Sequence, residues 1–318
     1  MSTASTGLGF LVKQAGVHTL LQDLGRFGRY SLGLTNGGPL DKTAFYWANR
    51  LVDNTANSCA LEISIGGLSL IAQMDMVIAI TGAPMPVTIN GVEQALWCSI
   101  QLYAGDEIRL GYSTAGLRSY LAVKGGFQTA KVFASRATVC REGLGGISGG
   151  PVKNNDVLPC LSSVTEHHVS LASQYRPTYS NEVTLRTIPG YQQKHFSAFS
   201  QRMFYSSEFC VSQHSDRMGY RLEGKAINAD IDGIISEGIC HGAVQIPSDG
   251  QPIVLLNDRQ TIGGYPKIGS VISLDTGKLA QLSPGAKVHF EPISMEAAHN
   301  LIHLHAAKLK ATQLAFIN

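Results

Sequence analysis

The sequence predicts a mainly β fold in two domains, and three observations support this. Short apolar runs that end at glycine or proline recur from Gly7 to Phe290. Glycine is abundant, at 34 of 318 residues, and charged residues make up only 15%, where about 25% is usual. Both features are typical of short buried strands joined by tight turns. The length also exceeds the roughly 250–300 residues at which single cores stop growing.

Turn signals delimit the strands that we expect. In the first half these strands are 76–80, 87–89, 100–103, 108–110 and 120–123. The Asn90-Gly91 pair that follows 87–89 is typical of a two-residue hairpin turn. In the second half we expect strands at 183–188, 243–246, 253–256 and 271–274.

Few helices are expected. Residues 40–51 have helical spacing of apolar positions, with Asp41 suited to cap the helix, and residues 294–313 form a C-terminal helix rich in Ala and Leu. The polar stretch 164–182 is interrupted by Pro177 and predicts a connection. We therefore expect domains at 7–180 and 181–318, with the possibility that segments are exchanged between them.

Composition argues against several protein classes. The net charge is only +2 and no lysine or arginine cluster occurs, so we expect no nucleic-acid partner. The most apolar stretch, Leu68 to Val87, is interrupted by Gln73 and Asp75, so we expect no membrane span. The N-terminal sequence lacks a secretory pattern, and six scattered cysteines without a Cys-x-x-Cys pair suit a reducing compartment. These observations predict a cytoplasmic protein.

The first candidate site follows the predicted strand at 253–256. Asp258, Arg259 and Gln260 offer a carboxylate, a guanidinium and an amide. The carboxylate could act as a general base, the guanidinium could bind an oxyanion or a carboxylate, and the amide could form hydrogen bonds with an amide substrate. Glycines allow close backbone approach. The alternative is a local Asp–Arg pair that stabilises a polar turn. The run continues with Gly263, Gly264, Tyr265, Pro266 and Lys267.

A second candidate cluster lies within Ser215–Leu222. Asp216 is followed by Arg217 and Arg221, so two nearby guanidinium groups favour its ionised form and leave one for an anionic substrate. A buried ion-pair network is the alternative. Gln245 could bind an amide-like substrate, or it could satisfy the backbone of a turn.

In the first half, four charged residues stand among glycines and are possible contributors to the site. A structural role is favoured here, because helix capping and turn formation explain both aspartates. These residues are Asp23, Arg26, Asp41 and Arg118.

Two further features suggest ordinary structure. His299 and His303 have the i,i+4 spacing of a metal pair but lack an HExxH motif, so we predict no metal site. The run Gly143–Gly150 matches neither a P-loop nor GxGxxG, and we expect a turn.

With these motifs the sequence resembles the allophanate hydrolase subunit 2 or KipA-type family. That family includes the C subunit of bacterial 5-oxoprolinase (PxpC) and is related to the carboxyltransferase region, subdomains A and B, of urea carboxylase. The sequence departs from the family pattern at Gly37 and Leu40, where Ser and Met are common, and at Asp53, where Gly is frequent. The matching segments are 22–28, 37–41, 48–54, 61–62, 81–83, 116–127, 215–222, 235–239, 245–267 and 280–290.

The resemblance implies two cyclophilin-like β-barrel subdomains and a site completed by other chains. The implied partners are a subunit 1, KipI or PxpB-type protein and possibly a LamB/YcsF-type subunit. The implied function is that of one subunit of an ATP-dependent 5-oxoprolinase, which hydrolyses the lactam of 5-oxoproline to glutamate. No cofactor is expected on this chain itself, because ATP is used by the complex. We expect the chain to be active only within that complex.

Under this resemblance the candidate residues take different roles. Asp258 or Asp216 would transfer protons, and Arg217, Arg221 and Arg259 would stabilise anions. Gln245 and Gln260 would read the amide of a small amide or lactam substrate, and Tyr265 and Lys267 would shape the pocket.

Two alternatives remain open at this stage. One is a biotin-dependent carboxyltransferase component that acts on urea or a similar amide; its biotin would come from another chain, because no Met-Lys-Met site occurs here. The other is a KipA-like regulatory protein that binds a kinase-inhibitor partner.

Overall fold

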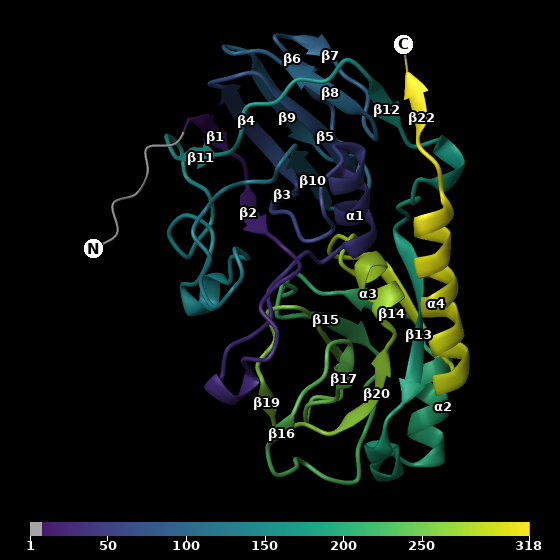
Figure 1. Cartoon of the computed structure of the whole chain (residues 1–318). Helices are drawn as coiled ribbons and strands as arrows, with labels where there is room; N and C mark the ends of the chain where they lie inside the picture. The colour runs from purple at the N-terminus through teal and green to yellow at the C-terminus, as the bar shows by residue number, and fades with distance from the viewer. Residues whose placement is uncertain (1–7, 318) are drawn as a thin grey trace. The chain divides into compact units, whose positions relative to one another are not determined.

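The computed structural model describes residues 8–317, and the chain divides into two compact units (Figure 1). Unit 1 contains the chain up to Phe27, then Gly37–Thr178 and the residues from Gln313 onward. Unit 2 contains Gly28–Asn36 and Tyr179–Thr312. The division at Thr178 lies close to the predicted domain boundary, and the predicted start at Gly7 lies outside the described residues. Two segments are exchanged, 28–36 and the C-terminal end.

Unit 1 contains two antiparallel sheets around one apolar core. Phe10, Leu61, Ile78 and Leu121 from both sheets are fully buried in this core. The six-stranded sheet has the order β11 (Val157–Pro159), β1 (Gly9–Ala15), β4 (Gly66–Ala72), β9 (Glu107–Tyr112), β6 (Val87–Ile89), β7 (Val92–Glu93). The five-stranded sheet has the order β2 (His18–Gln22), β3 (Ala60–Ser64), β10 (Arg118–Val123), β5 (Met76–Gly82), β8 (Ser99–Leu102).

Local sequence signals account for two features of unit 1. Helix α1 (Lys42–Leu51) begins after Asp41, whose Oδ1 accepts hydrogen bonds from the backbone N–H of Thr43 (3.1 Å) and Ala44 (3.0 Å). The predicted helix cap is thus confirmed. Asn90 and Gly91 both have positive φ, 50° and 83°, as the hairpin between β6 and β7 requires.

Unit 2 is a closed seven-stranded barrel. A parallel pair closes it, with Leu185 of β13 opposite Phe290 of β21. Phe204 stacks on Phe290 with ring centroids 4.3 Å apart, which seals the apolar interior under helix α2 (Ala198–Ser206). The strand order is β13 (Glu182–Pro189), β20 (Lys267–Val271), β17 (Ala243–Gln245), β18 (Ile253–Leu255), β15 (Gly219–Gly224), β14 (Phe209–Val211), β21 (Lys287–Pro292).

The prediction of a mainly β fold with few helices and a C-terminal helix is confirmed. Helix α4 (Met295–Ala311) starts after the capping Ser294. The described strands of unit 1 are divided among two large sheets and one two-stranded sheet, whereas those of the unit 2 barrel join in one closed ring. No helix within the described residues has both the length and the apolarity needed to cross a bilayer.

Two local predictions were wrong. The strand expected at 271–274 ends at Val271 of β20, and Ser273 and Leu274 belong to helix α3 (Ser273–Leu279). Buried Asp275 on this helix binds Arg186 of β13 through a contact that local sequence does not reveal. The stretch 164–182 is more than a connection. It contains β12 (His168–Ser170), which pairs with the C-terminal strand β22 (Ala315–Ile317) in Figure 1.

Candidate functional site

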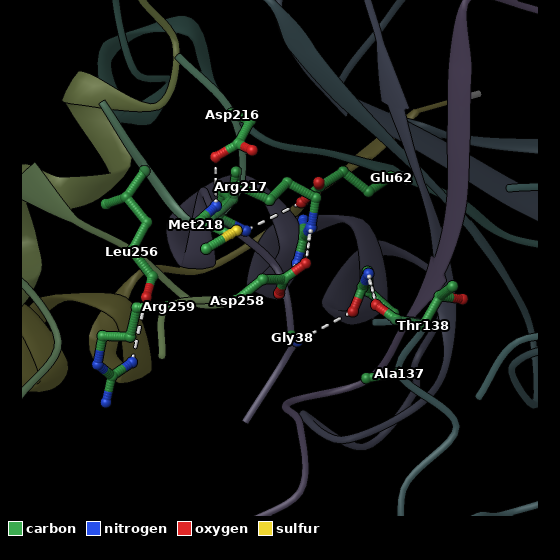
Figure 2. A network of polar contacts seen from close by, with 12 residues as sticks. Gly38, Glu62, Ala137, Thr138, Asp216, Arg217, Met218, Leu256, Asp258 and Arg259 are labelled. Carbon is green, nitrogen blue, oxygen red and sulfur yellow. Dashed lines mark hydrogen bonds and ion pairs between the residues drawn. The ribbon is translucent and has the colours of Figure 1, made fainter. Parts of the chain in front are cut away.

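The two predicted clusters of unit 2 meet at an ion pair between Arg217 and Asp258. Nε of Arg217 donates to Oδ2 of Asp258 (2.9 Å) and Nη2 donates to Oδ1 (3.1 Å), as Figure 2 shows. The backbone N–H of Asp258 also donates to the carbonyl oxygen of Arg217 (3.0 Å). Both side chains are nearly buried, at 8% and 6% exposed. The Asp–Arg pairing therefore joins the two motifs, and proton transfer by Asp258 would occur from within this pair.

Asp216 closes the turn that leads into β15. Its Oδ1 accepts a hydrogen bond from the backbone N–H of Met218 (2.8 Å), as Figure 2 shows, and another from that of Gly219 (3.2 Å). The residue is exposed to solvent. Asp216 thus fixes the backbone that follows Arg217, and its second carboxylate oxygen accepts no hydrogen bond from the described residues.

Arg259 is a buried cation whose hydrogen-bond partners are all neutral. Its side chain donates to the carbonyl oxygens of Leu256 (Nη1, 3.1 Å) and Ile239 (Nε, 3.2 Å), and to the hydroxyl of Tyr30 (Nη2, 2.8 Å). The residue is only 5% exposed. No carboxylate within residues 8–317 forms an ion pair with it. Because a buried charge is costly without an opposite charge, this guanidinium suits an anionic ligand.

Lys267, at the start of β20, is held by Glu237 of the short strand β16 (Glu237–Gly238). The ammonium forms an ion pair with Oε1 of Glu237, and the hydroxyl of Tyr191 donates to the same oxygen. Nε2 of Gln192 donates to it as well (3.0 Å). Hydrogen bonds from Lys267 first, and then from Tyr191, hold the pKa of the Glu237 carboxyl below its usual value.

Gln245 presents an amide without a partner. It is opposite Lys267 in the pairing of β17 with β20, so the two side chains point to the same face of the sheet. The residue is 4% exposed, and its side-chain amide has no hydrogen bond within the part of the chain that the structure describes. A Cβ at Gly263 of β19 (Ile262–Gly263) would lie 2.9 Å from Nε2 of Gln245, so glycine keeps the space beside the amide open.

Three of the predicted residues lie at the surface of unit 2. Arg221 on β15 and Gln260 are exposed, and Tyr265 is 46% exposed. They are therefore not part of the buried contacts around Arg217, Arg259 and Lys267, although solvent-facing groups can still reach a ligand.

In unit 1, the candidate residues Asp23 and Arg26 form hydrogen bonds with backbone groups. Asp23 accepts hydrogen bonds from the hydroxyl of Ser135 and from the backbone N–H of Arg136 (2.7 Å) and Gly25 (2.9 Å). Nη2 of Arg26 donates to the carbonyl oxygen of Ala137.

The loop before α1 is fixed in the same way. Gln22 accepts from the backbone N–H of Gly38 (3.0 Å) and donates to the carbonyl oxygen of Thr138 (3.0 Å). Nε of Arg118 lies 3.8 Å from Oε1 of buried Glu62, whose Oε2 accepts from the backbone N–H of Leu40 (2.9 Å).

Four residues that contact the candidate site were not predicted from the sequence. Glu237 is an acidic residue between two isoleucines in the segment 235–239, and that signal could have identified it. Tyr30 could not have been found, because 229 positions separate it from Arg259. Tyr191 and Gln192 likewise carry no distinguishing pattern. Within residues 8–317, no group of three or more His, Cys, Asp or Glu side chains is placed to hold a metal ion.

Comparison with known proteins shows the family to which the chain is related. Residues 32–292 match the carboxyltransferase domain family, subdomains A and B. The chain is 38% identical to the 5-oxoprolinase C subunit of Escherichia coli, over 90% of this chain and 91% of that protein. It is 34% identical to the 5-oxoprolinase C subunit of Haemophilus influenzae, over 88% and 90%. The crystal structure of Kluyveromyces lactis urea carboxylase has a TM-score of 0.90 and 26% identity over 98% of this chain, which spans only 30% of that protein.

Proposed function

This chain belongs to the carboxyltransferase domain family of subdomains A and B, and on that premise we propose that it is the C subunit of an ATP-dependent 5-oxoprolinase. Such a complex hydrolyses the lactam of 5-oxoproline to glutamate. Similarity to the C subunits of two bacteria extends over nearly the whole of each protein. The structural observation that carries the proposal is the buried guanidinium of Arg259, which has no anionic partner within the described residues.

The polar groups of unit 2 match the groups of 5-oxoproline. The substrate has a carboxylate, which Arg259 can bind, and a lactam, with which the side-chain amide of Gln245 can form hydrogen bonds. Lys267 offers a second cation on the face that carries Gln245. Gln260, Tyr265 and Arg221 would contact the ligand from the solvent side.

Ring opening requires water at the lactam carbonyl carbon. The carbon–nitrogen bond breaks, the water oxygen joins the carbon to give a carboxylate, and both water protons pass to the ring nitrogen, which becomes an ammonium. Asp258, held by Arg217, or exposed Asp216 would take the first of these protons from the water and pass it to the nitrogen, and Arg217 would stabilise negative charge that develops on the carbonyl oxygen. ATP hydrolysis supplies the free energy for ring opening. We assign no step of ATP hydrolysis to this chain.

We further propose that the chain works only in a complex. A C subunit implies further subunits in the two bacterial relatives, and the natural partners are a subunit 1, KipI or PxpB-type chain and a LamB/YcsF-type chain. All six cysteines are free thiols, which suits a reducing cytoplasm.

A second candidate is carboxyl transfer to urea or a similar amide. The likeness to Kluyveromyces lactis urea carboxylase over 98% of this chain favours it. That reaction would need carboxylated biotin delivered by another chain, and the open amide of Gln245 suits a ureido group as well as a lactam. The two functions must therefore be separated by assay.

The test is turnover by the complex of this chain with its subunit 1-type and LamB/YcsF-type partners. We expect ATP-dependent release of glutamate from 5-oxoproline and no ATP-dependent turnover of urea. Arg259→Ala should raise KM for 5-oxoproline about 10–100-fold, as for a lost charged hydrogen bond, and Asp258→Ala should abolish turnover. Exposed Arg202 on α2 provides the control, Arg202→Ala, which should behave as wild type. Activity on urea alone, or unchanged turnover in both site variants, would refute the proposal.

A further inference from the structure

Tyr30 reaches the candidate site from a segment that precedes the rest of unit 2 by more than a hundred residues. The chain leaves unit 1 at Phe27, contributes Gly28–Asn36 to unit 2, and resumes unit 1 at Gly37. Within this segment Tyr30–Leu32 form a short 3-10 helix, which ends at Gly33 with φ of 73°. The positive φ favours glycine there, so the segment has a defined turn.

The side chain of Tyr30 contacts the guanidinium of Arg259 in two ways. Its hydroxyl accepts a hydrogen bond from Nη2 (2.8 Å), and its ring centroid lies 5.8 Å from the guanidinium carbon, within the range of a cation–π contact. Arg259 is also held by the carbonyl oxygens of Leu256 and Ile239. Three neutral oxygens and one aromatic ring thus fix the plane of the guanidinium.

Tyr30 is a neutral partner of Arg259, and this determines how much of the positive charge stays available. A carboxylate in the place of Tyr30 would fix Arg259 and also neutralise it. A phenol hydroxyl and a π-face orient the cation but leave its charge available to a ligand. Tyr30 is 43% exposed, so the oriented cation lies beside a solvent-accessible side chain.

We propose that Tyr30 is a positioning residue, which holds the guanidinium of Arg259 for the carboxylate of an anionic ligand. The inference rests on the proposed function in one respect, that the ligand is the carboxylate-bearing substrate. The positioning itself depends only on the geometry around Arg259.

Conservative substitutions in the complex with its partner subunits test the proposal. Tyr30→Phe keeps the ring and removes the hydrogen bond, and it should raise KM for 5-oxoproline about 3–10-fold while kcat stays within about twofold. Tyr30→Ala should raise KM further. The control is Tyr103→Phe, at a tyrosine 61% exposed in unit 1, which should leave both parameters unchanged.

A double-mutant cycle separates positioning from general stability. In an Arg259→Ala background, Tyr30→Phe should have no further effect on KM, because the group that it positions is absent. If Tyr30 had only a structural role, Tyr30→Phe would lower the melting temperature, and its effect on KM would add to that of Arg259→Ala. Unchanged KM in Tyr30→Phe, or additive effects in the cycle, would overturn the proposal.

A binding readout distinguishes failure of this inference from failure of the proposed function. Sodium acetate is the carboxylate probe, and sodium chloride at equal ionic strength is the control. Acetate should raise the melting temperature of the wild-type chain more than chloride does, and the difference should shrink in Tyr30→Phe and vanish in Arg259→Ala. If acetate has these effects on a complex that does not turn over 5-oxoproline, the positioning role of Tyr30 is supported and the proposed function is rejected. An equal acetate effect in wild type and Tyr30→Phe would reject the inference.

Discussion

Arg217 and Asp258 bind each other through two parallel hydrogen bonds, although 41 positions separate them in the sequence. Both side chains are nearly buried. Breaking a buried ion pair costs about 3–5 kcal/mol, because the remaining charge loses its partner. The pair therefore ties the two motifs of unit 2 together and sets the environment in which either group could take part in catalysis.

Asp258→Asn should lower the free energy of unfolding by about 3 kcal/mol and abolish turnover, since it keeps the shape but removes the charge that faces Arg217. Urea denaturation measures the first effect and the complex assay the second. In a double-mutant cycle with Arg217→Met, the coupling energy should reach at least about 2 kcal/mol. Additive losses would show that the pair contributes nothing as a pair.

Glu237→Gln should release the ammonium of Lys267 to an anionic substrate. In the wild type the pKa of Glu237 is lowered by Lys267, so the carboxylate stays ionised at neutral pH and competes for that ammonium. We expect KM for 5-oxoproline to fall by about 2–5-fold, as for a weakened competing ion pair, with little change in kcat. A higher KM would instead mean that Glu237 itself contributes to binding.

Asp41 offers a test of capping against catalysis in unit 1. Asp41→Ala should lower the free energy of unfolding by about 1 kcal/mol, because the first turn of α1 loses its side-chain acceptor, whereas Asp41→Asn should retain the cap. Thermal unfolding measures both variants, and Ser294→Ala at the cap of α4 is the matched control. Loss of turnover in a stable Asp41→Asn protein would show that the charge has a role beyond capping.

Asp275 should govern part of the acid sensitivity of unit 2. Burial alone would raise the pKa of this carboxyl, but hydrogen bonds from Arg186 and Lys278 outweigh burial and lower it. A lowered folded-state pKa stabilises the protein above the unfolded value of about 3.9, and this stabilisation is lost as pH falls through the folded value.

Asp275→Asn should therefore cost about 3 kcal/mol at pH 7 and progressively less as the pH falls below about 4. Urea unfolding at pH 7, 5 and 3 measures the trend. Asp232→Asn, at an exposed aspartate of unit 2, should give the same stability as wild type at each pH. An equal cost of Asp275→Asn at all three pH values would contradict the linkage.

The strands were predictable where their signals are local. Asn90-Gly91 marks its hairpin because both residues tolerate positive φ, and Asp41 marks the start of α1 because its short side chain reaches the first turn. Helix α3 was not predictable, because it is held in place by the contact of Asp275 with Arg186, 89 positions away.

In the candidate site too, residues with local sequence signals were predictable and residues fixed by distant contacts were not. Asp258, Arg259 and Lys267 stood out because charged side chains follow strand ends among glycines. Tyr30 did not, because 229 positions separate it from Arg259, and Glu237 carries only the weaker signal of one acidic residue in the segment 235–239. Sequence patterns thus identified groups that carry chemistry but not the groups that orient them.

Omission of this chain from the complex tests whether it is a required part of a 5-oxoprolinase. The complex with all subunits, and the same mixture without this chain, should be assayed for glutamate formed from 5-oxoproline in the presence of ATP. We predict turnover only when the chain is present, with restoration by wild type and not by Asp258→Ala. Equal glutamate formation with and without the chain would show that the chain is not required.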